Sequence, residues 1–282
     1  TTLEDACNGR LNIYAMISGN GNGKSLMLTG HLDTVPGYGM EDPLCGQMRE
    51  GRLYGRGSCD MKGALAAMMA ALISIKRSGI ALKGDLYFIG VIDEEEAGRG
   101  TEYLVKNGPF TDGVIVGEPT GLRIGAGNKG LEWMEIKVKG KTVHAGAMEK
   151  GVNAISKAAK LIQRLENNYI PGLEAKRHPL LGLPTLNFGT ISGGDQPSSV
   201  PGECLIRADR RWVPGETLDE VYGEIRSVIE EIKGEDPTFD AEVRDMFENE
   251  NLLPHQPFCT DEWDPLIAAV RTAMCSLEQV ED

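Results

Sequence analysis

Residues 26–36, LMLTGHLDTVP, contain the feature that decides the fold class, an apolar run that ends in chemically active side chains. The run over 26–28 predicts a buried strand, and His31 and Asp33 follow at its carboxyl end. Open α/β sheets place their functional sites at the carboxyl ends of strands. His31 is therefore a candidate metal ligand, with an incidental histidine in a surface turn as the alternative.

Three further polar groups follow predicted strands or precede a predicted helix. Asp60 lies in GRGSCDMKG (55–63), before a helix predicted over 61–77; Asp93–Glu96 follows a predicted strand over 85–92, and Glu118 follows one over 113–116. Taken alone, Asp60 could be only the N-cap of the following helix. The acidic run, taken alone, could be only a solvated loop. Together, one imidazole and several carboxylates form a mixed nitrogen and oxygen donor set that suits zinc, cobalt or manganese.

The order of predicted elements indicates an α/β fold with an inserted domain. Strands and helices alternate in the first part of the chain, which favours a mostly parallel sheet covered by helices. A strand-helix-strand-strand-helix-strand order follows, which is typical of a ferredoxin-like α+β unit. The predicted boundaries are a first domain over 1–127, an insertion over 128–247 and a return to the first domain over 248–282.

Composition excludes some function classes. The chain has 29 Lys and Arg against 42 Asp and Glu, a net charge of −13, which argues against binding to nucleic acid. The longest apolar run, over 64–75, is too short to span a bilayer, so we expect no membrane partner. The six scattered cysteines form no C-x-x-C pair and predict reduced thiols in the cytoplasm.

Four motifs in order carry a family resemblance. GHLDTVP (30–36), GRGSCDMKG (55–63), DEE (93–95) and VGEPT (116–120) resemble the dinuclear metallo-hydrolases that include acetylornithine deacetylase, succinyl-diaminopimelate desuccinylase and glutamate carboxypeptidase. The resemblance covers nearly the whole chain. It implies hydrolysis of the amide bond of an N-acyl amino acid or small peptide. It also implies two Zn²⁺ ions per site, with Co²⁺ or Mn²⁺ possible, and a catalytic domain whose inserted lid forms a homodimer.

The resemblance also implies a set of metal ligands. His31 and Glu118 would hold one ion, Asp60 would bridge the two ions and Glu95 would hold the second. The family has a cis peptide after its bridging aspartate, which here is the bond between residues 60 and 61. Family members place a last histidine ligand for the second ion near their C-terminus. This chain ends without one, so we expect a truncated return segment and a weak second site.

Catalytic and substrate-binding roles follow from the same resemblance. Glu94 would be the general base, and Asp33 would orient His31. His144, in KGKTVHA (139–145), would reach a partner's active site and stabilise the oxyanion; a surface histidine is the alternative. Arg211, in a D-x-R-x-x-P match, would bind the substrate carboxylate, with an ordinary salt bridge as the alternative. Ser198 stands where many relatives have a substrate-binding asparagine.

Two other functions remain open at this point. The missing last ligand suggests a truncated relative that binds metal and ligand without turnover. A dimeric structural or regulatory protein is the third reading, but it leaves the carboxylates unexplained.

Overall fold

The computed structural model describes residues 1–249 and 252–277, which form two compact units. Unit 1 contains Thr1–Ile124 and the segment that starts at Pro265, and unit 2 contains Gly125–Asp264. The crossings predicted from the sequence lie at 127/128 and 247/248. The return crossing lies later because residues near 255 still bind unit 2: the Leu131 amide donates to the His255 carbonyl at 3.0 Å.

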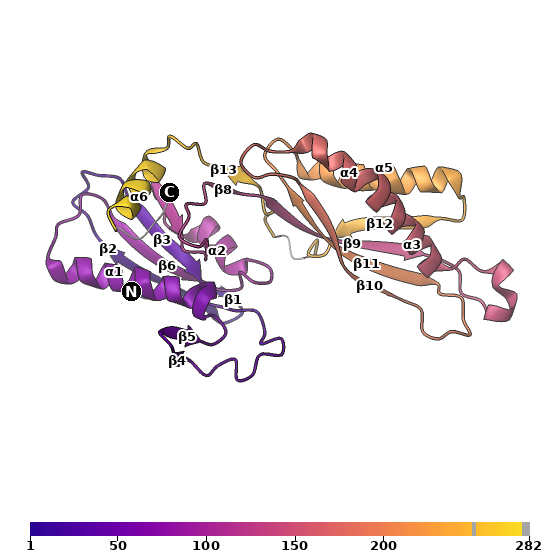
Figure 1. Ribbon diagram of the computed structural model, residues 1–282, viewed down its shortest axis with the longest axis horizontal. Coiled ribbons are helices and arrows are strands. Elements are labelled where there is room, and N and C mark those ends of the chain that lie inside the picture. The colour runs from indigo at the N-terminus through magenta and orange to yellow at the C-terminus, as the bar shows by residue number, and fades with distance from the viewer. Residues whose placement is uncertain (250–251, 278–282) are drawn as a thin grey trace. The chain divides into compact units, whose positions relative to one another are not determined.

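Unit 1 is built on a five-stranded sheet (Figure 1). Its order is β1 (Thr2–Cys7), β2 (Arg10–Ile17), β6 (Leu86–Val91), β3 (Leu26–His31) and β7 (Gly113–Val116). The prediction of a mostly parallel sheet is wrong, because β1–β2 and β2–β6 pair antiparallel and only β6–β3 and β3–β7 pair parallel. The β1–β2 pair is a hairpin with a tight turn at Asn8 and Gly9, which both have positive φ.

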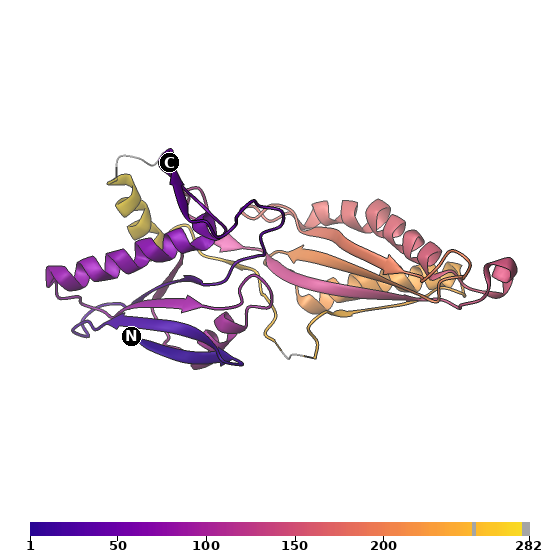
Figure 2. The same cartoon turned by 90° about the horizontal axis from the view of Figure 1, so that it is seen from below.

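Two helices cover opposite faces of this sheet, as Figure 2 shows. Leu86 and Phe88 belong to the core on the side of α1 (Gly63–Ser78), and Ile89 and Val91 to the core on the side of α2 (Arg99–Asn107). These residues divide between the two faces because successive side chains of a strand point to opposite sides. The α/β fold class is therefore correct, although the sheet is mixed.

The helical stretch Ser58–Ser78 is long and apolar enough to cross a membrane by length and composition alone, with a mean hydropathy of 1.4. It begins with a kinked segment, Ser58–Lys62, in which Asp60 and Met61 have non-helical backbone angles and the peptide between them is cis. Leu65 and Leu72 pack against strand residues of the sheet, which is the usual place of a helix in an α/β layer. Unit 1 also contains a small hairpin, β4 (Gln47–Arg49) and β5 (Arg52–Tyr54), and α6 (Pro265–Cys275).

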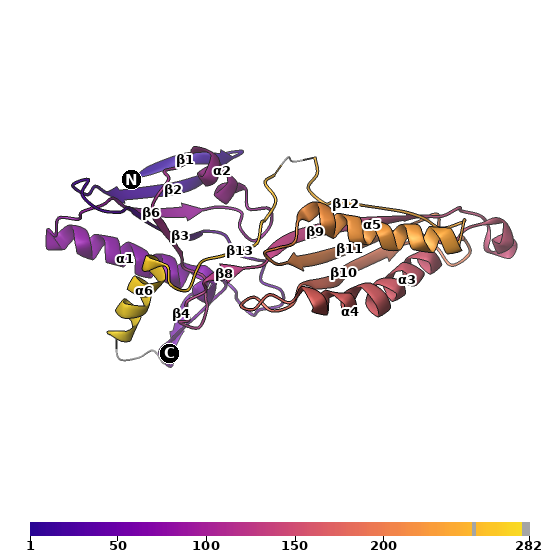
Figure 3. The ribbon, with the colours of Figure 1, turned by 90° about the horizontal axis from the view of Figure 1, so that it is seen from above.

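Unit 2 has the ferredoxin-like order that the sequence predicts. Its sheet order is β12 (Asp240–Asp245), β9 (Gly130–Lys139), β11 (Glu203–Trp212) and β10 (Thr185–Gly193), all antiparallel (Figures 1 and 3). The helices α3 (Ala154–Arg164) and α5 (Leu218–Glu235) share one apolar core with the sheet. A short α4 (Ile170–Gly172) follows α3, and β8 (Gly127–Asn128) pairs with β13 (Phe258–Cys259).

Candidate metal centre

His31, Asp60 and Glu118 come together at one edge of the unit 1 sheet. The Nε2 atom of His31 lies 2.8 Å from Asp60 Oδ1 and 3.9 Å from Glu118 Oε1. One donor atom from each of the three side chains lies within 4.8 Å of the others. His31 is buried, whereas the Asp60 and Glu118 side chains are partly open to solvent. An ion at this position would therefore have both a fixed protein wall and an open side.

Strand pairing accounts for two of these positions. Thr29 of β3 pairs with Val116 of β7 in a parallel register, and the Gly117 amide donates to the Thr29 carbonyl at 3.0 Å. His31 and Glu118 each lie two residues beyond this pair, so the register places them side by side. Equal offsets also turn their side chains to the same face of the sheet.

Met61 brings Asp60 to the same place. Its side chain is fully buried behind the strands, and its sulfur accepts a hydrogen bond from the His31 amide at 3.2 Å. A Cβ at Gly30 would lie 1.9 Å from the Met61 terminal carbon, and one at Gly117 would lie 3.1 Å from it. Glycine at these two positions therefore makes the space that lets Met61 hold Asp60 against His31.

Asp33 contacts both the histidine and the acidic turn. Its backbone carbonyl lies 3.0 Å from His31 Nδ1, and its carboxylate lies 3.6 Å from the same atom. The carboxylate accepts hydrogen bonds from the amides of Glu94 at 3.2 Å and Glu95 at 3.1 Å. The orienting contact on His31 is therefore the carbonyl of Asp33, and its carboxylate fixes the turn that carries the two glutamates.

Glu94 and Glu95 leave the end of β6 in different directions. The Glu95 carboxylate accepts a hydrogen bond from the Val35 amide at 3.2 Å. Among the described residues, the set of close donor atoms contains His31, Asp60 and Glu118 but not Glu95. Partial burial, reinforced by neighbouring carboxylates, raises the pKa of Glu94 above its usual value. A carboxylate with a raised pKa is a better proton acceptor than an ordinary surface glutamate.

The site concentrates negative charge around one imidazole. Burial raises the pKa of Glu118, and the charges of Glu94 and Asp60 raise it further. Burial opposes a charge on His31, but its hydrogen bond with Asp60 and the surrounding carboxylates outweigh this and raise its pKa. Carboxylates that raise one another's pKa values favour a bound cation, which would neutralise them.

The donor set fits a transition-metal ion. Zinc bonds to nitrogen and oxygen ligands are about 2.0–2.2 Å long, so neighbouring donors around one ion lie about 3–4 Å apart. The His31–Glu118 separation of 3.9 Å lies in that range, and the 2.8 Å between His31 and Asp60, a hydrogen bond here, lies just below it. One histidine and two carboxylates are donors that suit zinc, cobalt or manganese.

The three remaining predicted residues lie in unit 2. His144 is exposed, its Nδ1 accepts a hydrogen bond from the Gly146 amide at 3.1 Å, and it forms a β-bridge with Ser199. Ser198 is its near neighbour, because the Ala145 amide donates to the Ser198 carbonyl at 2.9 Å. Arg211 donates from Nε to Asp209 at 2.8 Å, so its guanidinium already has a carboxylate partner. The structure thus brings His144 and Ser198 together on one loop pair.

Asp93, the first residue of the acidic run, has a structural role that the sequence does not reveal. It is 1% exposed, has a positive φ of 67° and forms ion pairs with Arg10 and Arg99. A run of four carboxylates does not reveal that its first member points inward. Its only sequence signal is its place directly after a buried strand.

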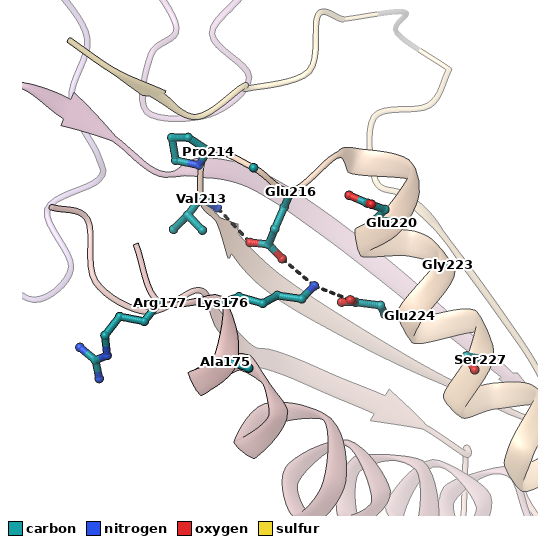
Figure 4. A pocket seen from close by; sticks show the side chains of 11 residues that line it. Ala175, Lys176, Arg177, Val213, Pro214, Glu216, Glu220, Gly223, Glu224 and Ser227 are labelled. Atoms are coloured by element: carbon teal, nitrogen blue, oxygen red, sulfur yellow. Dashed lines mark hydrogen bonds and ion pairs between the residues drawn. The ribbon is translucent and has the colours of Figure 1, made fainter. Parts of the chain in front are cut away.

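A separate pocket of about 670 Å³ lies in unit 2, beside α5 (Figure 4). The Lys176 ammonium lies between the carboxylates of Glu216 and Glu224, with 3.0 Å to Glu216. Glu216 also binds the buried Arg210 at 2.7 Å. The charges that line this pocket are thus paired within the protein, and we assign no chemistry to it.

Comparisons with known proteins identify the relatives of this chain. The family model Peptidase family M20/M25/M40 matches residues 27–281. An acetylornithine deacetylase of Myxococcus xanthus is 33% identical over 247 residues, which are 86% of this chain and 64% of that protein. An acetylornithine deacetylase of Proteus mirabilis is 34% identical over 242 residues, which are 81% of this chain and 60% of that protein. The chain thus spans somewhat less than two thirds of the length of these relatives.

Solved structures share the fold at lower identity. An M20 family metallo-carboxypeptidase from Sulfolobus solfataricus has a TM-score of 0.74 and 20% identity, with 97% of this chain and 74% of that chain covered. A dinuclear metal-binding M20 peptidase from Bacillus subtilis has a TM-score of 0.65 and 17% identity, with 98% and 70% covered. Because the family model matches residues 27–281, which are nearly the whole of this chain, the chain belongs to the peptidase family M20/M25/M40.

Proposed function

We propose that this chain hydrolyses the amide bond of an N-acyl amino acid or small peptide in a metal-dependent reaction. The observation that carries the proposal is the convergence of His31, Asp60 and Glu118 from separate segments, with Glu94 beside them. Two relatives that match most of the chain are acetylornithine deacetylases, and the similar Sulfolobus structure is a metallo-carboxypeptidase. Both names describe the cleavage of a carbon–nitrogen amide bond.

Zinc is the proposed ion, and cobalt and manganese suit the same donors. His31 and Glu118 would hold one ion, Asp60 would bridge, and Glu95 would hold a second ion once its carboxylate leaves the Val35 amide. The similar Bacillus subtilis peptidase is described as dinuclear. Bound metal supplies Lewis acidity, which polarises the scissile carbonyl and makes a water acidic enough to attack near neutral pH.

The protein's own groups would perform the proton transfers. Glu94 accepts the proton of the attacking water and passes it to the leaving amine, for which its raised pKa is suited. Asp33 keeps Glu94 in place through the Glu94 amide and keeps the His31 ring in one orientation. In unit 2, His144 would donate a hydrogen bond to the developing oxyanion, Arg211 would bind the substrate carboxylate, and Ser198 would help to bind the substrate.

We further propose a homodimer formed through unit 2, in which His144 serves the partner's site. The edge strand β10 supports this, because its outer side pairs with no strand in the described chain and Ile191 on it is 53% exposed. We place the protein in the cytoplasm. Five cysteines that stand as reduced thiols support a reducing compartment, namely Cys7, Cys45, Cys59, Cys204 and Cys259.

The test compares Glu94→Gln with Glu96→Gln on a panel of N-acetyl amino acids that includes N-acetylornithine. Glu96 is an exposed carboxylate on the same turn and is the matched control. We expect Glu94→Gln to lower kcat by about 10²–10⁴-fold and to keep bound metal, measured by elemental analysis. The control should keep both within about twofold.

Retention of turnover within a few-fold in Glu94→Gln would show that another group is the base. If the unaltered chain holds metal but hydrolyses none of the panel, the metal- and ligand-binding alternative is the better description.

A further inference from the structure

We propose that Arg10, Asn12 and Asp93 are positioning residues that hold the acidic turn carrying Glu94 and Glu95. This inference rests on the proposed function, because it gives the turn its catalytic purpose. None of the three residues belongs to the metal-binding or substrate-binding set described above. Arg10 and Asn12 lie on β2, more than 80 residues earlier in the chain than the turn that they contact.

Asp93 fixes the start of the turn. Its φ of 67° turns the backbone out of β6 in a conformation that non-glycine residues rarely adopt. Its carboxylate is 1% exposed, and each of its oxygens receives a guanidinium. Arg10 binds one oxygen, and Arg99 binds the other at 2.6 Å. A buried carboxylate held from both sides leaves the residue that follows it little freedom.

Asn12 fixes the two ends of the turn against each other. Its side-chain nitrogen donates to the Gly100 carbonyl at 2.8 Å, and its side-chain oxygen accepts from the Ile92 amide at 3.1 Å. Gly100 in turn donates to the Ile92 carbonyl at 3.1 Å. A Cβ at Gly100 would lie 2.3 Å from that carbonyl oxygen, so the contact requires glycine. Asn12 is completely buried, as a residue that ties two backbone segments should be.

Asp33 holds the same turn from the side of the metal site. It accepts from the Glu94 and Glu95 amides, and the Gly98 amide closes the turn on the Asp93 carbonyl at 2.6 Å. Asp33 thus binds the amides of Glu94 and Glu95 from the side of the metal site. Arg10 and Arg99 bind the preceding residue, Asp93, from the other side. Small displacements of a general base cost large factors in rate, so this double support has a direct catalytic use.

Arg10 gives the cleanest test, because its side chain is 48% exposed and its removal leaves the core intact. The variants are Arg10→Gln, Arg10→Lys and, as a matched control, Arg164→Gln. Arg164 binds Glu235 with two hydrogen bonds at 2.7 and 2.8 Å in unit 2. Asp93→Asn is a second variant that weakens the same ion pairs from the other partner.

The first readout is amide hydrogen exchange of the metal-free protein. In Arg10→Gln and Asp93→Asn we expect exchange of a peptide over 92–100 to accelerate by at least about tenfold, while a peptide over 26–31 exchanges as before. Arg10→Lys should restore slow exchange in part, because it keeps one charge. Arg164→Gln should leave both peptides unchanged.

The second readout is steady-state kinetics on the substrate found in the panel. We expect kcat to fall by about 10-fold to 100-fold in Arg10→Gln, with KM within about threefold, since the loss is one of geometry at the base. Unchanged exchange over 92–100, or equal acceleration throughout unit 1, would overturn the inference. If the unaltered chain lacks hydrolysis, the exchange result still decides the role of Arg10, so the two proposals fail separately.

Discussion

Glu132 is a buried carboxylic acid at the centre of unit 2, and its ionisation is linked to stability. It lies on β9, is 7% exposed, and accepts a hydrogen bond from the Tyr222 hydroxyl at 2.5 Å. Burial raises its pKa to about 7, although the Tyr222 hydrogen bond works in the opposite direction. The folded state binds the protonated acid more readily than the unfolded state does. Glu132 therefore destabilises the folded protein least below its unfolded pKa, where the acid is protonated in both states. Stability should fall as the pH rises from about 4.5 to about 7.

We therefore predict that Glu132→Gln stabilises the protein above pH 7. The amide can still accept from Tyr222 and never ionises, so the gain at pH 8 should be about 2–3 kcal/mol and should nearly vanish at pH 4.5. Chemical denaturation at both pH values measures the difference. Equal free energies of unfolding for the variant and the parent at pH 8 would contradict the prediction.

Single positions differ in how far the sequence reveals them. His31, Asp60 and Glu118 could be proposed as ligands because each lies within a recognisable motif, and their close approach in the structure follows from strand register and from the packing of Met61. The sequence analysis expected Asp33 to orient His31 but could not show that its carbonyl makes the contact. That depends on backbone direction after the strand, which side-chain identity does not specify. The inward turn at Asp93 was missed for the same reason.

At the scale of single elements, α5 shows how a local sequence sets a boundary. The Thr217 side chain accepts from the Glu220 amide at 3.3 Å, and the Glu220 carboxylate accepts from the Thr217 amide at 2.8 Å. This capping box satisfies two amides that the helix leaves without partners. The helix then buries a long apolar stripe in the unit 2 core.

Thr217→Ala should destabilise the protein by about 1 kcal/mol, because it removes the cap of α5. Ser227→Ala is the control: Ser227 is exposed within the same helix, and alanine there should be neutral or slightly stabilising. Urea denaturation of the two variants and the parent gives the comparison. A loss in Ser227→Ala as large as that in Thr217→Ala would show that the cap is not the cause.

Elements with strong periodicity were predictable, and short edge elements were not. The expected helix over 61–77 corresponds to α1 within a few residues, and the two helices expected in the order of the inserted domain are α3 and α5. The strand β1 was missed because TLEDAC has no clear alternation of apolar and polar residues. It forms by pairing antiparallel with β2 across a tight turn, next to the antiparallel pair β2–β6. A short edge strand that is only partly buried leaves little trace in the local apolar pattern.

For the whole molecule, the prediction concerns assembly through the edge of β10. Ile191 is 53% exposed there, and Ile155 on α3 is 40% exposed. An unpaired strand edge with exposed apolar residues is a template for pairing with a second chain. If the proposed homodimer uses this edge, Ile191→Lys should shift it to monomer in sedimentation velocity runs.

The control for this prediction is Phe110→Lys, which changes an 89% exposed apolar residue of unit 1. It should leave the sedimentation coefficient unaltered, and circular dichroism should show both variants folded. A parent protein that sediments as a monomer, or an Ile191→Lys variant that stays dimeric, would rule out β10 as the interface.

The pairing of β8 with β13 has an evolutionary consequence. The chain enters unit 2 through Gly127–Asn128 and leaves it through Phe258–Cys259, and these two strands pair with each other. The inserted domain is therefore attached to unit 1 like a single long loop, because the strands by which the chain enters and leaves it are held together. Loop-closure entropy grows only slowly with length, so a domain attached in this way can be enlarged, shortened or exchanged at little cost to its host.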